Sequence, residues 1–207
     1  MFTDSHCHLS FPELQAQLPQ IREAMVQAQV DRALCICTTL EEFETVHTLA
    51  TSYDNFWCSV GVHPDNEGVL EPSLDDLVQR AARPKVVAIG ETGLDYYRLG
   101  ERSLADMHWQ RERFRTHIRA ARQTGKPLVI HTRSASADTL AILGRGRNGG
   151  QRGASGRGVS LLHRDGRSCP GCPGPGLLHL VFGHFDLQER LRPARSCPFC
   201  TAGPHPD

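Results

Sequence analysis

Histidine and carboxylate side chains recur in this sequence where short apolar segments end. His6 and His8 are separated by one residue in a segment typical of a β-strand, so their side chains point to the same face, about 7 Å apart along it. Two imidazoles in this arrangement can bind one divalent metal ion at roughly 2.0–2.1 Å. Asp4 shares their face and can orient them from behind as a carboxylate partner. Alone, the pattern is weak, because two histidines also meet at a strand end by chance.

Three further apolar segments end in residues of the same chemical type. These residues are His63, Glu91 and His131. Glu91 stands between Gly90 and Gly93, a setting poorly suited to core packing. A carboxylate there is well suited to bridging two metal ions, because it has two oxygens to share. Four such segment ends together favour a metal site over a chance distribution.

The elements that must position these residues alternate between strands and helices. The predicted strands are 2–8, 32–37, 56–62, 86–90 and 127–131. The predicted helices are 14–28, 41–52, 73–82 with Ser73 as N-cap, 105–124 and 135–143. This alternation predicts an α/β fold with parallel strands and right-handed crossovers. The carboxyl ends of such strands share one rim, where active sites of parallel barrels lie.

The motifs at these strand ends resemble the successive signatures of the TatD family, metal-dependent hydrolases and deoxyribonucleases of the amidohydrolase superfamily. The matching stretches are Thr3-Asp4-Ser5-His6-Cys7-His8-Leu9, Gly61-Val62-His63-Pro64, Gly90-Glu91-Thr92-Gly93-Leu94-Asp95-Tyr96-Tyr97 and Pro127-Leu128-Val129-Ile130-His131-Thr132-Arg133. The resemblance covers residues 1–143 in the family's order. It implies that this part is a partial TIM (β/α)8-type barrel made of the first five βα units.

The same resemblance implies a centre of two divalent metal ions, with Zn, Mn, Mg or Fe as candidates. Its implied ligands are His6 and His8 on the first ion, His131 on the second, and Glu91 bridging both. The ions would polarise a phosphodiester and activate water, which makes Glu91 catalytic as well as a ligand. His63 would be the second catalytic residue, beside the substrate. Asp4 and Asp95 would support the ligands from behind.

The implied substrate is a DNA end or a related phosphodiester. Thr132 and Arg133 are candidate phosphate contacts, although Arg133 is equally well interpreted as a solvent-facing charge. A lactonase or amidase of the same superfamily is the alternative, and the Gly-Glu-Thr-Gly-Leu-Asp stretch argues against it. No obligate protein partner is evident.

The localisation prediction rests on composition. No stretch of 18 apolar residues is present, and the N-terminus has no basic region followed by an apolar run, so neither a membrane span nor a signal peptide is expected. Four cysteines in or beside apolar runs indicate a reducing compartment, and we expect a cytoplasmic protein.

Residues 144–207 have a different composition from the rest. They carry a net charge of +5 against −5 for residues 1–143, and they hold 13 of the 19 Gly and 7 of the 13 Pro. The predicted domains are therefore the barrel part, 1–143, and an irregular or disordered tail, 144–207. The tail contains Cys169-Pro170-Gly171-Cys172 and Cys197-Pro198-Phe199-Cys200, a pairing that ordinarily indicates a zinc ribbon able to bind nucleic acid.

A shifted reading frame explains more of this tail. The family has two further ligands, a His in a His-Cys-Phe-(Thr/Ser) motif and an Asp in a Glu-Thr-Asp motif, and neither motif occurs in the sequence. Residues 160–165 can be encoded so that a one-base shift reads His-Cys-Phe-Thr-Glu. Most of the remaining tail also permits family-like helix and strand sequences in that frame. We therefore hypothesise a frameshift near Gly144, which leaves this chain without two ligands and catalytically impaired.

Resequencing the gene tests the frameshift hypothesis. We expect a one-base insertion or deletion near the codon for Gly144, and an intact frame through the Cys-rich tail would refute it. Zinc titration of an isolated 144–207 peptide tests the alternative, because a genuine ribbon binds zinc tightly at neutral pH.

Overall fold

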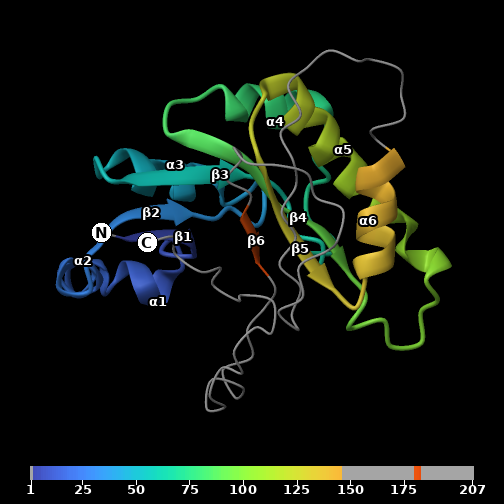
Figure 1. Cartoon of the computed structure of the whole chain (residues 1–207), viewed down its shortest axis with the longest axis horizontal. Coiled ribbons are helices and arrows are strands. Elements are labelled where there is room, and N and C mark those ends of the chain that lie inside the picture. Colours follow the sequence, from blue (N-terminus) through green and yellow to red (C-terminus); the bar gives the residue numbers. More distant parts are fainter. Residues whose placement is uncertain (1, 146–179, 183–207) are drawn as a thin grey trace, which may run out of the picture.

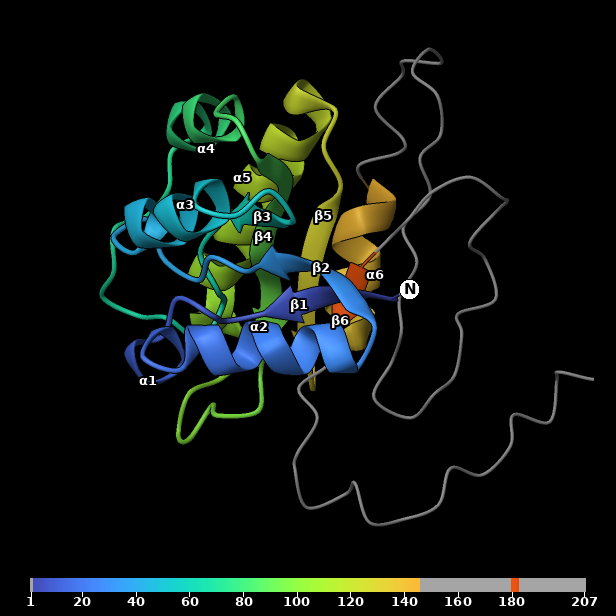
Figure 2. The same ribbon diagram turned by 90° about the vertical axis from the view of Figure 1, so that its left-hand side faces the viewer.

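The computed structural model describes residues 2–145 and 180–182 of the 207-residue chain. Its strands form one sheet in the order β1-β2-β3-β4-β5-β6, and all neighbours are parallel. They are β1 (Phe2–Cys7), β2 (Val30–Cys35), β3 (Phe56–Val60), β4 (Val86–Asp95), β5 (Leu128–Arg133) and β6 (Leu180–Phe182). The first five strands alternate with helices and form half of a barrel, as the sequence predicts (Figures 1 and 2).

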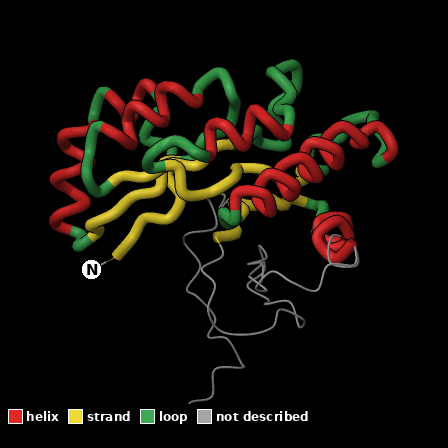
Figure 3. Tube along the Cα trace, turned by 90° about the horizontal axis from the view of Figure 1, so that it is seen from above, coloured by secondary structure: helices red, strands yellow, loops and turns green. Residues whose placement is uncertain are grey.

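The helices lie along one face of this curved sheet (Figure 3). They are α1 (Pro12–Gln15), α2 (Leu18–Gln27), α3 (Phe43–Thr51), α4 (Leu74–Ala81), α5 (His108–Thr124) and α6 (Ser136–Arg145), with a 3-10 turn, η1 (Ala105–Met107), before α5. Ser73 caps α4 as predicted: its hydroxyl accepts from the Asp76 amide, and the Asp76 carboxylate accepts from the Ser73 amide.

The two faces of the sheet carry cores of different size. The larger core lies on the helix-covered face, where alternate strand residues such as Cys35 and Cys58 pack with Phe43 of α3 and Leu77 of α4. On the opposite, concave face the described residues form a small buried cluster of Leu34, Ile36, Ala88 and Val129. Alternation along each strand therefore separates a structural face from a face that is available for a site.

The single helix predicted over 14–28 is wrong, because the structure has two helices there. α1 ends at Gln15 and α2 begins at Leu18, with Gln17 out of the helical region at φ −107° and ψ 10°. Proline stands in the first turn of α2, where its missing N–H costs nothing, but it cannot continue a helix from the preceding segment. The apolar spacing of Leu14 and Leu18 thus runs across a break.

The fourth strand is longer than predicted. It continues past Gly90 to Asp95, and Gly93 pairs with His131 of β5. β5 is not at the edge of the described sheet, since β6 pairs with it at Val129–His131. Apart from Gly144, Arg145 and β6, the predicted tail and both Cys-x-x-Cys motifs lie outside the described residues.

Three of the four cysteines that lie in or beside apolar runs are buried. Cys35, Cys37 and Cys58 are buried, while Cys7 is half-buried, and all four are free thiols. Burial raises the pKa of Cys37 and of Cys58 to about 12, so both stay protonated and unreactive. Within the described part of the chain, no helix is long and apolar enough to cross a membrane.

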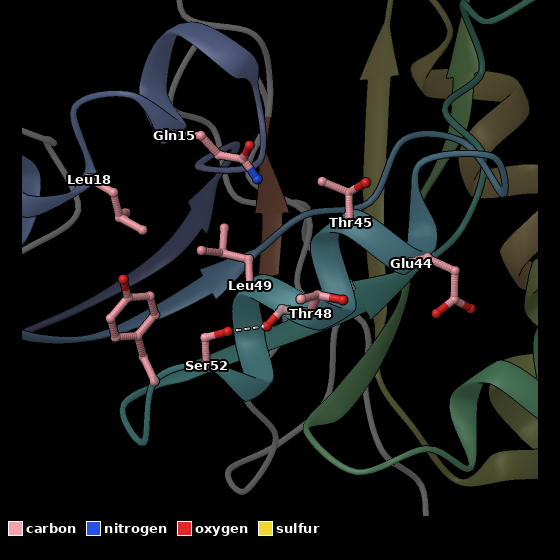
Figure 4. Close-up of a pocket in the computed structure, with 8 residues that line it drawn as sticks. Gln15, Leu18, Glu44, Thr45, Thr48, Leu49 and Ser52 are labelled. Atoms are coloured by element: carbon pink, nitrogen blue, oxygen red, sulfur yellow. Dashed lines mark hydrogen bonds between the residues drawn. The ribbon is translucent and has the colours of Figure 1, made fainter.

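A surface pocket of about 510 Å³ lies on the helical side of the sheet, away from its concave face. Gln15 of α1 and Leu18 of α2 face Thr48 and Leu49 of α3 across it (Figure 4). None of its lining residues belongs to a group able to hold a metal ion among the described residues. The residues predicted to do chemistry therefore lie elsewhere.

Replacement of Gly93 by Ala tests the close approach of β4 to β5. Gly93 has φ +135°, and a Cβ at this position overlaps the carbonyl oxygen of His131. We expect Gly93→Ala to lower the free energy of unfolding by about 2–4 kcal/mol, measured by urea denaturation. The matched control is Gly144→Ala in α6, where a Cβ meets nothing within 4 Å. It should be neutral or stabilising by up to about 1 kcal/mol. Equal stability of the two variants would contradict the described packing.

Candidate metal centre

The predicted site residues meet at the carboxyl-terminal rim of the half-barrel. His6 comes from the end of β1, His63 follows β3, Glu91 lies in β4 and His131 in β5. Because all of these strands are parallel, their ends reach the same rim, and the predicted convergence is observed.

Glu91 is at the centre of this cluster. Its Oε2 lies 3.3 Å from His6 Nε2, and its Oε1 lies 3.5 Å from His131 Nδ1 and 3.8 Å from His63 Nε2. The two carboxylate oxygens thus face different imidazoles. Burial alone would raise the pKa of Glu91, but hydrogen bonds from His131 and His6 hold it well below the usual range, and the group is ionised.

Two overlapping groups have the composition and spacing of a metal site. One is His6, His8 and Glu91, and the other is His63, Glu91 and His131; in each, the ligand atoms lie within 4.8 Å of one another. The donor set, imidazole plus carboxylate, suits Zn, Mn or Fe. His8 Nδ1 is buried and has no hydrogen-bond partner among the described atoms, which fits a nitrogen kept for an ion. The residues present therefore fit a bound metal.

His131 is held in one orientation by Asp95. Its Nε2 lies 2.9 Å from Asp95 Oδ2, which leaves Nδ1 facing Glu91. Burial alone would lower the pKa of His131, but the hydrogen bonds to Asp95 and Glu91 outweigh it and raise the pKa to about 9. With this pKa the metal-free ring carries a proton on each nitrogen. A metal ion that binds Nδ1 must displace the Nδ1 proton, while Nε2–H keeps its hydrogen bond to the Asp95 carboxylate. This is the arrangement predicted for Asp95 as a partner behind a ligand.

His63 is bound through its other ring nitrogen. The main-chain N–H of Asp65 donates to His63 Nδ1 at 3.1 Å, so in the neutral ring the proton is on Nε2. That Nε2 lies 3.1 Å from His131 Nδ1. Burial lowers the pKa of His63 to about 4, which keeps the ring neutral. A protonated Nε2 cannot bind a metal, so this geometry favours a hydrogen-bond donor beside the centre, the place predicted for His63 from the sequence.

The remaining predicted residues lie around the rim. Asp4 is exposed, and its Oδ1 accepts from the main-chain N–H of His6 at 3.1 Å; its role behind the imidazoles stays a prediction. Arg133 is half-buried, with its guanidinium carbon 3.6 Å from the centre of the Tyr97 ring. Its Nε is buried and has no hydrogen-bond partner among the described atoms. Arg133 is therefore more enclosed than a solvent-facing charge.

Three residues that contact this rim were missed from the sequence. Gln110, Arg113 and His117 of α5 are buried and polar, and they contact the chain segments that carry His63 and Asp95. In the predicted helix 105–124 they fall in phase with Phe114 and Ile118, on the apolar face. Polar residues in phase with an apolar face were the available signal.

Comparisons with known proteins point to one family. A model of the family described as "TatD related DNase" matches residues 3–159. The chain is 40% identical over 144 residues to the uncharacterized metal-dependent hydrolase YcfH of Escherichia coli K12, covering 68% of this chain and 52% of that protein. It is 34% identical over 145 residues to the uncharacterized metal-dependent hydrolase TatD of Mycobacterium tuberculosis, covering 68% and 54%.

Solved structures of the same kind share the fold. The crystal structure of YjjV, a TatD homolog from Escherichia coli K12, matches with a TM-score of 0.63 at 29% identity, over 70% of this chain and 55% of that one. A TatD-family hydrolase from Entamoeba histolytica matches with a TM-score of 0.56 at 22% identity, over 72% and 55%. The chain thus spans about half the length of the curated relatives it matches.

Replacement of Asp95 tests its control of His131. In Asp95→Asn the partner of Nε2 is no longer a charged acceptor, so the His131 tautomer that presents Nδ1 is no longer enforced. We expect Co²⁺ or Zn²⁺ affinity, measured by calorimetry, to fall by about 10- to 100-fold.

The matched control for this measurement is Asp65→Asn. The Asp65 carboxylate lies on the same rim but pairs with the exposed Arg98 at 3.2 Å, and the substitution keeps the Asp65 main-chain N–H. Its metal affinity should stay within about threefold of the unsubstituted chain. Equal effects of the two substitutions would show that Asp95 does not act through His131.

Proposed function

This chain belongs to the TatD-related DNase family of metal-dependent hydrolases, and from that premise we propose that its rim serves the hydrolysis of phosphodiester bonds in DNA. The observation that carries the proposal is the placement of Glu91, whose two oxygens face different imidazole groups. That placement supports two divalent ions bridged by one carboxylate. Because the chain spans about half of its curated relatives, the full set of ligands and the activity of the whole protein belong to this proposal.

Each described residue has a role that follows from its surroundings. His6, His8 and Glu91 would hold one ion, and Glu91 and His131 the other. Divalent ions held there would supply Lewis-acid chemistry, polarising a phosphodiester and increasing the acidity of water. Asp95 keeps His131 Nε2 protonated, and so directs Nδ1 toward the centre.

His63 would act on the substrate rather than on a metal. Its Nε2–H points toward His131 and Glu91, where a phosphoryl oxygen would lie in the complex. A neutral imidazole donor there stabilises negative charge that develops on that oxygen. The lowered pKa of His63, due to burial, keeps this donor neutral at physiological pH.

Arg133 supports a phosphodiester over a neutral substrate. It stands two residues after His131 in β5. Burial raises the pKa of Asp95, but hydrogen bonds, chiefly from His131, outweigh it, and the positive charge of Arg133 lowers this pKa further. No carboxylate pairs with Arg133 in an ion pair among the described residues. A guanidinium held by an aromatic ring and without a carboxylate partner is suited to a phosphate of the DNA backbone.

The buried free thiols bear on where the protein works. Cys35 and Cys37 lie in the helix-covered core and have no disulfide partner in the described part of the chain. They support a reducing compartment, and we propose the cytoplasm.

The test compares two forms of the protein on a panel of DNA, lactone and amide substrates. A frame-corrected form should hydrolyse DNA with a divalent ion, and Glu91→Gln should lower its rate by about 10³-fold, since the carboxylate shared by both groups is lost. The 207-residue chain itself should show no metal-dependent nuclease activity above background.

Several outcomes would contradict these expectations. Turnover of lactones or amides in preference to DNA would remove the phosphodiesterase proposal. Nuclease activity of the 207-residue chain that is abolished by Glu91→Gln would show that the ligands missing from its sequence are not needed. Ser73→Thr, which keeps the hydroxyl that caps α4 and hydrogen-bonds with Asp76, is the matched control and should not change any rate.

A further inference from the structure

Three buried polar side chains lie on one face of α5. Gln110 is 1% exposed, Arg113 4% and His117 0%, and their spacing places them on neighbouring turns. Burying an amide, a guanidinium and an imidazole is unfavourable unless each finds hydrogen-bond partners. The identity of those partners shows what this face does.

The partners of Arg113 and His117 are main-chain groups just after β3. The N–H of Val62 donates to His117 Nε2 at 3.0 Å, and His117 Nδ1–H donates to the Arg113 carbonyl at 2.8 Å. Arg113 Nη1 donates to the carbonyls of His63 and Asn66, both at 2.8 Å. Burial lowers the pKa of His117 to about 4, so its Nε2 remains an acceptor. The segment that carries His63 is therefore fixed on both sides.

Gln110 joins this segment to the end of β4. Its Nε2 donates to the Pro64 carbonyl at 2.9 Å and to the Asp95 carbonyl at 3.1 Å. Its Oε1 accepts from the Asp95 N–H at 3.0 Å. One side chain thus sets the position of the loop after His63 relative to the residue that orients His131.

Arg113 is also held by Glu71, which lies between β3 and α4, and by Trp109 of its own helix. Its guanidinium forms a two-point ion pair with Glu71, including a 2.9 Å bond from Nε to Oε2, and stacks on Trp109 with 4.7 Å from its carbon to the ring centre. The Arg113 side chain is 1% exposed, whereas that of Glu71 is 58% exposed. The charge of Arg113 is therefore paired with a carboxylate at the surface, while its Nη1–H groups donate to main-chain carbonyls of residues 63–66.

We propose that Gln110, Arg113 and His117 form a positioning face. This face holds His63 Nε2–H and the Asp95 carboxylate in fixed positions relative to each other at the rim. The catalytic purpose of this face rests on the proposed function, but its effect on His63 does not require a metal. The loop geometry that brings the Asp65 N–H to His63 Nδ1 is the geometry that Gln110, Arg113 and His117 bind. Loss of these bonds should therefore change the tautomer of His63, which a purely space-filling role would not do.

The experiment uses the full 207-residue chain without metal, labelled with ¹⁵N-histidine for the ring signals and uniformly for the amides. In the unsubstituted chain we expect His63 as the Nε2–H tautomer, with slowly exchanging amides at Val62 and Asp95. Gln110→Leu keeps the side-chain volume and removes three hydrogen bonds. It should mix the two His63 tautomers and speed exchange at Asp95 by about tenfold or more.

The control for lost packing is Ile118→Ala on the same helix. Ile118 is 6% exposed and packs in a separate apolar cluster with Phe114 and Ile130. We expect it to lower the melting temperature without changing the His63 tautomer. A change of tautomer in Ile118→Ala equal to that in Gln110→Leu would overturn the proposal, because loss of stability alone would then explain both.

A second pair of variants tests His117. His117→Leu removes the acceptor of the Val62 N–H and should speed exchange at Val62 and mix the His63 tautomers, whereas His117→Gln can place an amide oxygen at the same point and should restore both. Failure of His117→Gln to restore either signal would overturn the proposal. So would a His63 Nδ1–H tautomer, or rapid exchange at Val62, in the unsubstituted chain.

These measurements separate the two conclusions. The absence of hydrolysis dependent on Glu91 in the frame-corrected form would remove the proposed function and leave the positioning result standing. An unchanged His63 tautomer in Gln110→Leu would remove the positioning face and leave the proposed function standing.

Discussion

The Glu91 carboxylate is 5% exposed, and its ionised form must be stabilised by something other than water. Three imidazoles surround it, within 3.3 to 3.8 Å of its oxygens. A charge at this depth is stable only if its partners are held in place, since a displaced partner leaves it buried and unpaired. The rim is therefore built around one constraint, and the strand ends, Asp95 and the loop after β3 all serve to keep imidazole nitrogens on this carboxylate.

The neighbours of each imidazole decide what it can do. Asp95 accepts from His131 Nε2, so His131 directs its Nδ1 to the centre. The Asp65 N–H donates to His63 Nδ1, so His63 presents an N–H instead. Two histidines whose rings lie 4.4 Å apart thus have different chemistry because one ring faces a carboxylate and the other a main-chain amide. The spacing of His63 and His131 in the sequence does not predict this difference in protonation, because it depends on partners that the fold brings together.

Sequence reasoning recovered the architecture because hydrophobic periodicity and parallel topology are local and general. Five βα units and the convergence of strand ends follow from them. The errors have local causes: proline in the first turn of α2 breaks a helix that apolar spacing alone extends, and the pairing of Gly93 with His131 lengthens β4. The polar face of α5 was missed for a deeper reason. Gln110 lies in phase with the apolar face of its helix, but the sequence does not show which main-chain groups it binds there.

Alternation along the strands keeps folding and chemistry on separate faces. In β1, His6 faces the rim with Glu91, while its neighbour Cys7 packs against the helix-covered core. In the part of the chain that the structure describes, the buried cluster on the concave face is small, so the rim residues gain little from apolar packing on their own side. Their order must come from hydrogen bonds to the main chain, which are directional and weaken steeply when donor and acceptor are misaligned. Such bonds can come from a helix that packs on the helix-covered face of the sheet and whose polar side chains reach the strand ends. α5 does this with residues spaced so that the helix remains anchored by Phe114 between them. The stability of the apolar packing around α5 is thereby transmitted to a site that has little core of its own.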